Sequence, residues 1–251
     1  MAGVGGVRWL RLLLVPVMFA TASFALWLLF ISRPPLKSGV TPDLHFPRSV
    51  SDLRVLADVS SAYQRDHYSY ILALFSAAYV YKQTFAIPGS ALLNLLGGAL
   101  LGCWPLGLPL CCLLTAIGAS NCFLLSRLAG RDLVVSKFSS TIESLREKLG
   151  DNKQQMFVYL VSVRVFPMTP NWLLNITAPL LDVPLSLFFL SVLIGLVPYN
   201  LVCVQAGEVL SEVRSLDDVL TPRRILALLT LALAVLTLSH FTQKAKNKHS
   251  D

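Results

Sequence analysis

The sequence predicts an all-α, polytopic membrane protein with about six transmembrane helices. Hydrophobic residues make up 55% of the 251 residues and charged residues only 14%, against about 25% charged residues in ordinary soluble domains. The charges gather in a few stretches, and uncharged runs long enough to cross a bilayer lie between them. Two further apolar stretches are interrupted by proline and glycine. We expect these two to form Pro-broken re-entrant hairpins that are related as an inverted repeat.

Charge and motifs argue against a nucleic-acid-binding protein and against an enzyme. The formal net charge is +7, but the lysines and arginines flank apolar segments and form no stripe with aromatic residues between them. The five cysteines lie in apolar sequence without a CxxC pair, so we interpret them as packing residues. The four histidines are scattered, and no nucleophile, zinc or phosphate-loop motif occurs. We therefore expect no catalytic residues, no metal and no cofactor.

The first predicted domain, residues 1–33, is an N-terminal anchor helix. An uncharged apolar run from Leu12 to Ile31 is bounded by basic residues and is long enough to span a membrane. Its start also has the pattern of a secretory signal peptide, with small residues at 20–22 as a possible cleavage site. Because the apolar sequence continues to Ile31 without a pause, a retained anchor is the favoured interpretation.

Two polar stretches carry a capping-box pattern followed by apolar residues at helical spacing. In the segment 34–67, Ser49 and Asp52 occupy the capping positions. This segment predicts an amphipathic helix on the membrane surface, and a solvated connector helix is the alternative. The stretch 131–153 repeats the pattern and predicts a second surface helix.

The predicted core, residues 68–206, contains both interrupted stretches, which we expect to form hairpins near 82–104 and 164–183. In the first stretch we expect breaks at Pro88-Gly89, Gly97-Gly98 and Gly102. Regular spans are predicted from about 106 to 128 and from 184 to 204, the latter kinked near Pro198. The residues 207–241 hold a polar segment and a final span, and a basic tail occupies 242–251.

The two interrupted stretches match each other in sequence. Each begins with a cation, Lys82 or Arg164, reaches a proline after the same spacing, and continues to a Leu-Leu-Asn triplet ending at Asn94 or Asn175. Paired breaks of this kind are typical of transporters built from inverted repeats. Irregular backbone in hydrocarbon must be shielded by protein or face water. We therefore predict that the two hairpins face one another and form a polar cleft.

The two cations suggest what the cleft binds. A cation at the centre of a bilayer costs at least about 2.5 to 3.5 kcal/mol, so it is usually there to meet a ligand, and a lipid phosphate is the obvious one. In the alternative interpretation, both cations reach a headgroup layer and the asparagines cap broken helix ends. The candidate headgroup path is Lys82, Arg164, Ser90, Asn94, Asn171 and Asn175, with hairpin breaks at Pro88, Gly89, Pro167, Pro170 and Pro179 and one nearby titratable group, Asp182.

Several motifs together resemble a known family. They are Phe85-Ala-Ile-Pro-Gly-Ser90, Gly118-Ala-Ser120, Arg164 through Trp172, and Asn175-Ile-Thr-Ala-Pro179. In these motifs the chain resembles the transmembrane protein 41 family, and is nearer to its A member. That family lies within the wider DedA group, whose VTT domain is shared with vacuole membrane protein. The resemblance extends from about residue 51 to residue 241.

The resemblance implies residence in the endoplasmic reticulum and movement of phospholipids between leaflets without ATP. For the B member of the family it also implies links to lipid mobilisation and autophagosome formation. Bacterial DedA relatives carry an acidic residue after the Pro-Gly of the first hairpin and are thought to couple lipid carriage to protons. This chain has Ser90 at that position, which favours passive exchange.

Three functions remain as hypotheses. The leading one is an energy-independent phospholipid scramblase, whose partners are membrane phospholipids and not nucleic acid. The second is a proton- or ion-coupled transporter of small solutes or lipids, with Asp182 as the group that titrates. The third is a structural membrane adaptor that recruits partners through its surface helices. Basic residues at both ends favour cytosolic termini and an even number of crossings.

Overall fold

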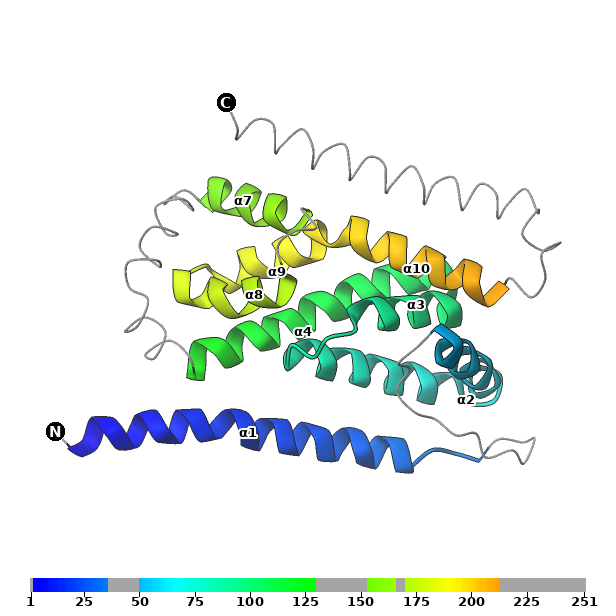
Figure 1. Cartoon of the computed structure of the whole chain (residues 1–251), viewed down its shortest axis with the longest axis horizontal. Helices are drawn as coiled ribbons and strands as arrows, with labels where there is room; N and C mark the ends of the chain where they lie inside the picture. The colour runs from blue at the N-terminus through cyan, green and yellow to red at the C-terminus, as the bar shows by residue number, and fades with distance from the viewer. Residues whose placement is uncertain (1, 36–49, 130–152, 166–169, 213–251) are drawn as a thin grey trace. The chain divides into compact units, whose positions relative to one another are not determined.

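The computed structural model describes residues 2–35, 50–129, 153–165 and 170–212 (Figure 1). Within these residues the chain is helical and contains no strand. Nearly all of the predicted surface helix 131–153, the Pro167 break, the final span and the basic tail lie outside the described residues. The elements are α1 (Ala2–Ile31), α2 (Val50–Thr84), α3 (Ser90–Leu101), the π-helix η1 (Gly102–Gly107), α4 (Leu108–Ala129), α7 (Lys153–Val165), α8 (Asn171–Thr177), the 3-10 helix η2 (Ala178–Leu181), α9 (Leu185–Gly195) and α10 (Val197–Glu212).

The chain divides into two compact units. The first unit is drawn from Met1–Arg33, Leu74–Pro88 and Leu113–Leu196. The second unit is drawn from Pro34–Ala73, Gly89–Cys112 and Val197–Asp251. The helices α2 and α4 each contribute residues to both units.

The described helices include two stretches that are long and apolar enough to cross a membrane. They are Leu13–Ile31 in α1 and Ser90–Ala129, which joins α3, η1 and α4. A third candidate is the pair Leu185–Gly195 and Val197–Ser211, which is bent by 43°. This bend confirms the kink that the sequence predicts near Pro198, where the proline lacks the N–H that a continuous helix requires. The described residues therefore contain two segments, or three if the bent pair forms one span, that are long and apolar enough to cross a membrane.

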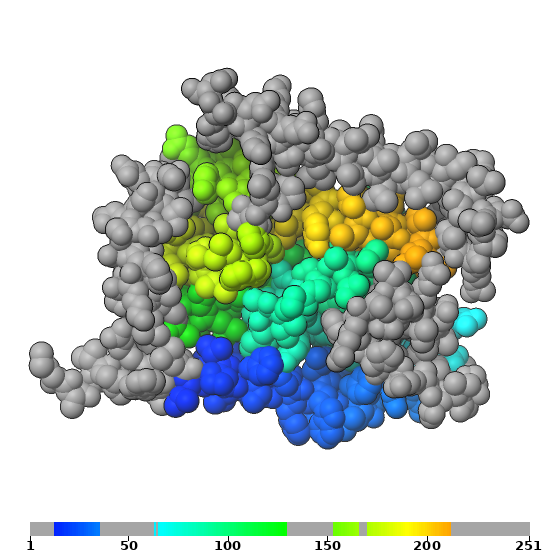
Figure 2. Space-filling model, in the orientation of Figure 1, coloured from blue at the N-terminus to red at the C-terminus, as the bar shows by residue number. Residues whose placement is uncertain are grey.

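Exposed apolar side chains cover most of the span Leu13–Ile31 in α1, as a helix in contact with lipid requires. Within the span Leu13–Ile31 no residue is fully buried, and the blue surface in Figure 2 belongs to this helix. Aromatic rings join this helix to the end of α2 and the bend after it: the ring centroid of Phe19 lies 5.7 Å from that of Tyr81 and 5.0 Å from that of Phe85. The hydroxyl groups of Ser23 and Tyr81 form a hydrogen bond of 2.7 Å.

The helix α2 changes direction at His67, which has non-helical dihedral angles (φ −144°, ψ 57°). The predicted amphipathic segment 34–67 ends at the same residue. The helix then continues to Thr84, and the chain bends through residues 85–89, where Ala86 and Gly89 have positive φ angles of 52° and 111°. This bend lies at the predicted Pro88-Gly89 break.

In the second unit α3 packs closely against α10. A Cβ at Gly98 would lie 1.8 Å from the carbonyl oxygen of Val204, and one at Gly207 would lie 1.9 Å from that of Leu95. The glycines therefore allow the two backbones to approach, as small residues do in membrane helix pairs. The expectation that Gly97-Gly98 breaks the helix is wrong, because both residues lie inside the regular helix α3 and are buried.

The first unit has an apolar core formed by α4, α7, η2 and α9. Phe123 on α4 and Phe188 on α9 are fully buried, and their ring centroids lie 4.7 Å apart. Around them pack buried small and branched residues, among them Ala116, Leu160 and Val192. The core thus fixes the buried face of α9, which carries Phe188, Ser191, Val192 and Gly195.

Candidate functional site

Arg164 lies in the last turn of α7 and is only 5% exposed. The helix ends at Val165, and Pro170 has an extended backbone (φ −60°, ψ 120°) that a continuous α-helix does not allow. The chain resumes helical structure in α8, with Pro170 at the N-cap. The break between α7 and α8 confirms the prediction that no single regular helix runs through this stretch.

Three neutral side chains hold the guanidinium group of Arg164. Its Nε donates a hydrogen bond to Oγ of Ser191 at 3.3 Å, and its Nη1 donates to Oδ1 of Asn175 at 3.3 Å. The same Nη1 also donates to Oδ1 of Asn171. Nη2 is buried and has no hydrogen-bond partner among the described residues. The N–H groups of Nη2 therefore have no acceptor among the described residues.

The helix α9 provides the support for this arginine. The guanidinium carbon lies 4.7 Å from the ring centroid of Phe188, a cation–π geometry. Ser191 is fully buried and donates a hydrogen bond of 2.7 Å to the carbonyl of Phe188, so its oxygen faces Arg164 as an acceptor. A Cβ at Gly195 would lie 2.9 Å from Cβ of Arg164. The absence of a side chain at Gly195 therefore makes room for the stem of the arginine.

The electrostatics of this cluster favour an anion. All the hydrogen-bond acceptors of Arg164 among the described residues are neutral amide or hydroxyl oxygens. A buried cation without a counter-charge is costly in a medium of low dielectric constant. The unused N–H groups on Nη2 can donate charge-assisted hydrogen bonds to a phosphate or carboxylate oxygen. Arg164, Asn171, Asn175 and Ser191 therefore form an arginine cluster suited to anion binding.

Lys82 occupies the corresponding place in the first interrupted stretch. It lies in the last turn of α2 and is 5% exposed. Its Nζ donates a hydrogen bond of 3.3 Å to Oε1 of the neighbouring residue Gln83. Gln83 in turn packs on α4, where a Cβ at Gly118 would lie 2.5 Å from Cβ of Gln83. Lys82 belongs to the first unit, as Arg164 does.

Ser90 and Asn94 belong to the second unit. Asn94 is fully buried in α3 and donates a hydrogen bond of 2.9 Å to Oδ1 of Asn200 in α10. Asn200 is also buried, and its Nδ2 lies 3.4 Å from Sγ of Cys112. Ser90 is half-buried at the first position of α3. In the first interrupted stretch Asn94 therefore pairs with the amide of Asn200. In the second stretch Asn175 pairs with the guanidinium of Arg164.

The remaining predicted residues lie at the turns. Pro88 is exposed in the bend before α3, and Pro179 is buried at the start of η2. Asp182 is exposed, with a positive φ of 56° at the end of η2. The transporter hypothesis predicts that this carboxylate titrates within the cleft, and that stays a prediction.

The structure brings together three of the residues predicted for the headgroup path: Arg164, Asn171 and Asn175. Sequence reasoning missed Ser191, Phe188 and Asn200. Ser191 and Asn200 are polar residues within apolar stretches of α9 and α10, and a buried polar group in such a stretch needs a partner. That pattern could have identified both of them.

The cysteines and acidic residues form no metal site in the described part of the chain. Four of the five cysteines are buried and Cys203 is half-buried. Their burial fits the interpretation that they are small packing residues.

Comparison with known proteins gives the family. Residues 87–209, which include the arginine cluster, match the VTT domain. The chain is 32% identical to transmembrane protein 41B of Danio rerio over 95% of this chain and 84% of the relative. It is 32% identical to the human protein of the same name over 97% of this chain and 83% of the relative.

No solved structure matches the chain. The relatives named above are B members of the family, and the closer likeness to the A member stays a prediction. The extent of the match, nearly the whole of this chain and most of each relative, exceeds that of a shared domain. The chain therefore belongs to the transmembrane protein 41 family.

Proposed function

We propose that this protein is an energy-independent phospholipid scramblase in which Arg164 meets the phosphate of the passing headgroup. One observation carries the proposal: a buried guanidinium group is held by neutral acceptors, and its Nη2 lacks a partner among the described residues. In a membrane protein the most abundant anionic oxygens at hand are those of lipid phosphates. Arginine suits them because its planar N–H groups match the geometry of phosphate oxygens.

The arrangement also favours release of the headgroup. Asn171, Asn175 and Ser191 already satisfy part of the guanidinium, so a phosphate gains the hydrogen bonds of one nitrogen and not a closed clamp of several cations. A site for a permeating group must bind strongly enough to admit it and weakly enough to let it leave. A partly satisfied arginine meets both conditions.

The proposal includes two re-entrant hairpins and a topology of about six spans. The repeat supports it: Asn94 is the fifth residue of α3 and Asn175 the fifth residue of α8, each helix follows a break, and both side chains are buried. We further propose that Lys82 contributes to the headgroup path and that the protein resides in the endoplasmic reticulum, where it mobilises lipid. Exchange is passive, because Ser90 replaces the acidic residue of bacterial relatives.

The test is leaflet exchange in liposomes that contain the purified full-length chain and a phospholipid with a fluorescent headgroup. A membrane-impermeant reductant that quenches the outer leaflet then reports exchange as loss of the protected inner signal. We expect nearly complete quenching without ATP, slowed in Arg164→Gln. Arg127→Gln is the matched control, because Arg127 is an exposed arginine on α4. Exchange no faster than in protein-free liposomes would contradict the proposal.

A further inference from the structure

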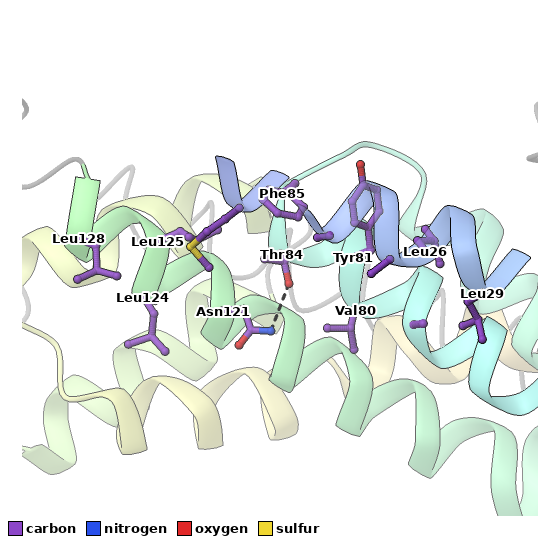
Figure 3. Close-up of a pocket in the computed structure, with 14 residues that line it drawn as sticks. Leu26, Leu29, Val80, Tyr81, Thr84, Phe85, Asn121, Leu124, Leu125 and Leu128 are labelled. Carbon is purple, nitrogen blue, oxygen red and sulfur yellow. Dashed lines mark hydrogen bonds between the residues drawn. The ribbon is translucent and has the colours of Figure 1, made fainter. Parts of the chain in front are cut away.

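A groove in the first unit is lined by α1, the end of α2 with the bend after it, and α4 (Figure 3). None of its lining residues belongs to the arginine cluster. Its volume is about 620 Å³, within the range of about 300 to 1,000 Å³ found for small-molecule sites. Alanines from α1 and α2 form part of its wall, and leucines from α4 form another part. Its size and apolar walls are those of a site for a hydrocarbon chain.

The groove is continuous with the lipid-facing surface of the protein. Met18 on α1 and Leu124 and Leu128 on α4 line it and are 42%, 38% and 55% exposed. The span Leu13–Ile31, which forms one wall, has no fully buried residue. Bilayer lipid therefore has direct access to the groove.

A polar pair lies within these apolar walls. Nδ2 of Asn121 donates a hydrogen bond of 3.3 Å to Oγ1 of Thr84, and both residues line the groove (Figure 3). The hydroxyl hydrogen of Thr84 and the second Nδ2 hydrogen of Asn121 have no acceptor among the described residues. Both are neutral donors, so a neutral carbonyl oxygen in the groove would complete the pair.

The lining also determines which kind of chain fits. No residue that lines the groove carries a charge. The carboxylate of a free fatty acid would therefore lose its hydration without gaining a counter-ion. An ester carbonyl loses far less and can accept from the neutral donors of Thr84 and Asn121. Charge complementarity thus favours an esterified acyl chain.

We propose that this groove binds one acyl chain of a phospholipid, with an ester carbonyl at the Thr84–Asn121 pair. The inference deepens the proposed function and rests on it for the identity of the lipid. Arg164 contacts the phosphate of the lipid. The groove binds one acyl chain, a part of the lipid for which the arginine cluster has no apolar site. The protein then has separate sites for the polar and apolar parts of its substrate.

The experiment uses liposomes that contain the full-length chain and a phosphatidylcholine with a photoreactive diazirine on one acyl chain. Labelled residues are mapped by mass spectrometry. The readout is the labelling of Leu125, which lines the groove but is only 8% exposed, relative to Leu113, which is 44% exposed on the same helix and is not among the groove residues. Labelling of Leu125 requires that the chain enter the groove.

A groove-filling variant and its control make the test specific. Ala25 and Ala20 are both exposed alanines on α1, but only Ala25 lines the groove. We expect Ala25→Phe to lower the Leu125-to-Leu113 labelling ratio about tenfold, as overpacking of a site does, and Ala20→Phe to leave it unchanged. An equal ratio in the two variants overturns the inference. Stronger labelling of Leu125 by a diazirine fatty acid than by the phospholipid also overturns it.

Leaflet exchange is measured on the same liposomes, so the two proposals fail separately. Exchange without labelling of Leu125 overturns the groove and leaves the scramblase standing. Labelling of Leu125 that responds to Ala25→Phe, without exchange, supports the groove and overturns the proposed function.

Discussion

The two interrupted stretches share a backbone plan but differ in what their polar residues contact. In each, a buried cation ends one helix and a buried asparagine is the fifth residue of the helix that follows the break. Arg164 reaches across its break to Asn175, whereas Lys82 bonds to its neighbour Gln83. Two stretches with the same sequence pattern can therefore share the break in the helix and still differ in the polar contacts around that break.

The chemistry of the two cations explains the difference. A guanidinium directs its N–H groups along several directions in one plane, so it can bind two neighbouring amides and keep Nη2 available. An ammonium is a compact point charge on a flexible stem. We infer that Arg164 dominates headgroup contact and that Lys82 has a supporting role.

Substitution of these two cations should have the largest effect on the rate of leaflet exchange. Arg164→Gln should lower the rate of leaflet exchange at least about tenfold, the equivalent of one lost charge-assisted hydrogen bond. Arg164→Lys should not restore it, because the three N–H groups of lysine, which lack the planar arrangement of a guanidinium, cannot serve Ser191, both asparagines and a phosphate together. Lys82→Gln should have a smaller effect. Equal losses from Lys82→Gln and Arg164→Gln in the liposome assay would refute the asymmetry between the stretches.

The second prediction separates the roles of the two asparagines. Asn94→Leu should lower the free energy of unfolding by about 1 to 3 kcal/mol, because it leaves the buried Oδ1 of Asn200 without a donor. The double variant Asn94→Leu/Asn200→Leu should recover most of that loss. Asn175→Leu should slow exchange more than it lowers stability. Denaturant unfolding in detergent measures the stability, and a single Asn94→Leu variant as stable as wild type would be evidence against the amide pair.

The third prediction concerns the space beside Arg164. Gly195→Ala places a Cβ 2.9 Å from that of the arginine, so it should displace the guanidinium and slow exchange by about threefold to tenfold. Ser186→Ala on the same helix is the control, because Ser186 is exposed. A Gly195→Ala protein that exchanges lipid at the wild-type rate would show that the position of Arg164 is unimportant.

The smallest effect is expected at Asp182. Because this carboxylate is exposed, Asp182→Asn should change exchange by less than about twofold, as surface substitutions usually do. An imposed pH gradient should not alter the rate in either protein. A gradient-dependent rate that disappears in Asp182→Asn would favour the coupled transporter instead.

The sequence predicts the breaks in the fold better than the contacts around them. Proline and a change in charge are local signals, and they place the ends of α7 and α4 and the bend between α9 and α10 within a few residues. The predicted break at Gly98 is wrong because a glycine can either interrupt a helix or let a second helix pack closely against it. Which of the two occurs depends on whether a partner helix is present.

Part of the candidate site was predictable because some of its residues lie close together in the chain. Asn171 and Asn175 lie close to Arg164 in the chain, so their contact with it follows from the break between α7 and α8. Ser191 approaches it only through the packing of α9 against α7, which depends on tertiary structure. Asn200 and the Thr84–Asn121 pair also depend on partners that are distant in the chain, so the sequence around each residue does not indicate its partner.

The most direct test of the central claim is a distance between Arg164 and lipid phosphorus. Solid-state NMR on protein labelled with ¹⁵N-arginine in liposomes measures dephasing of the guanidinium nitrogens by ³¹P. The difference between wild type and Arg164→Gln isolates this one residue from arginines at the membrane surface. We expect a buried-arginine signal that the phosphorus dephases strongly, as hydrogen-bonding contact requires. A signal that persists without dephasing would show that the buried arginine meets no phosphate.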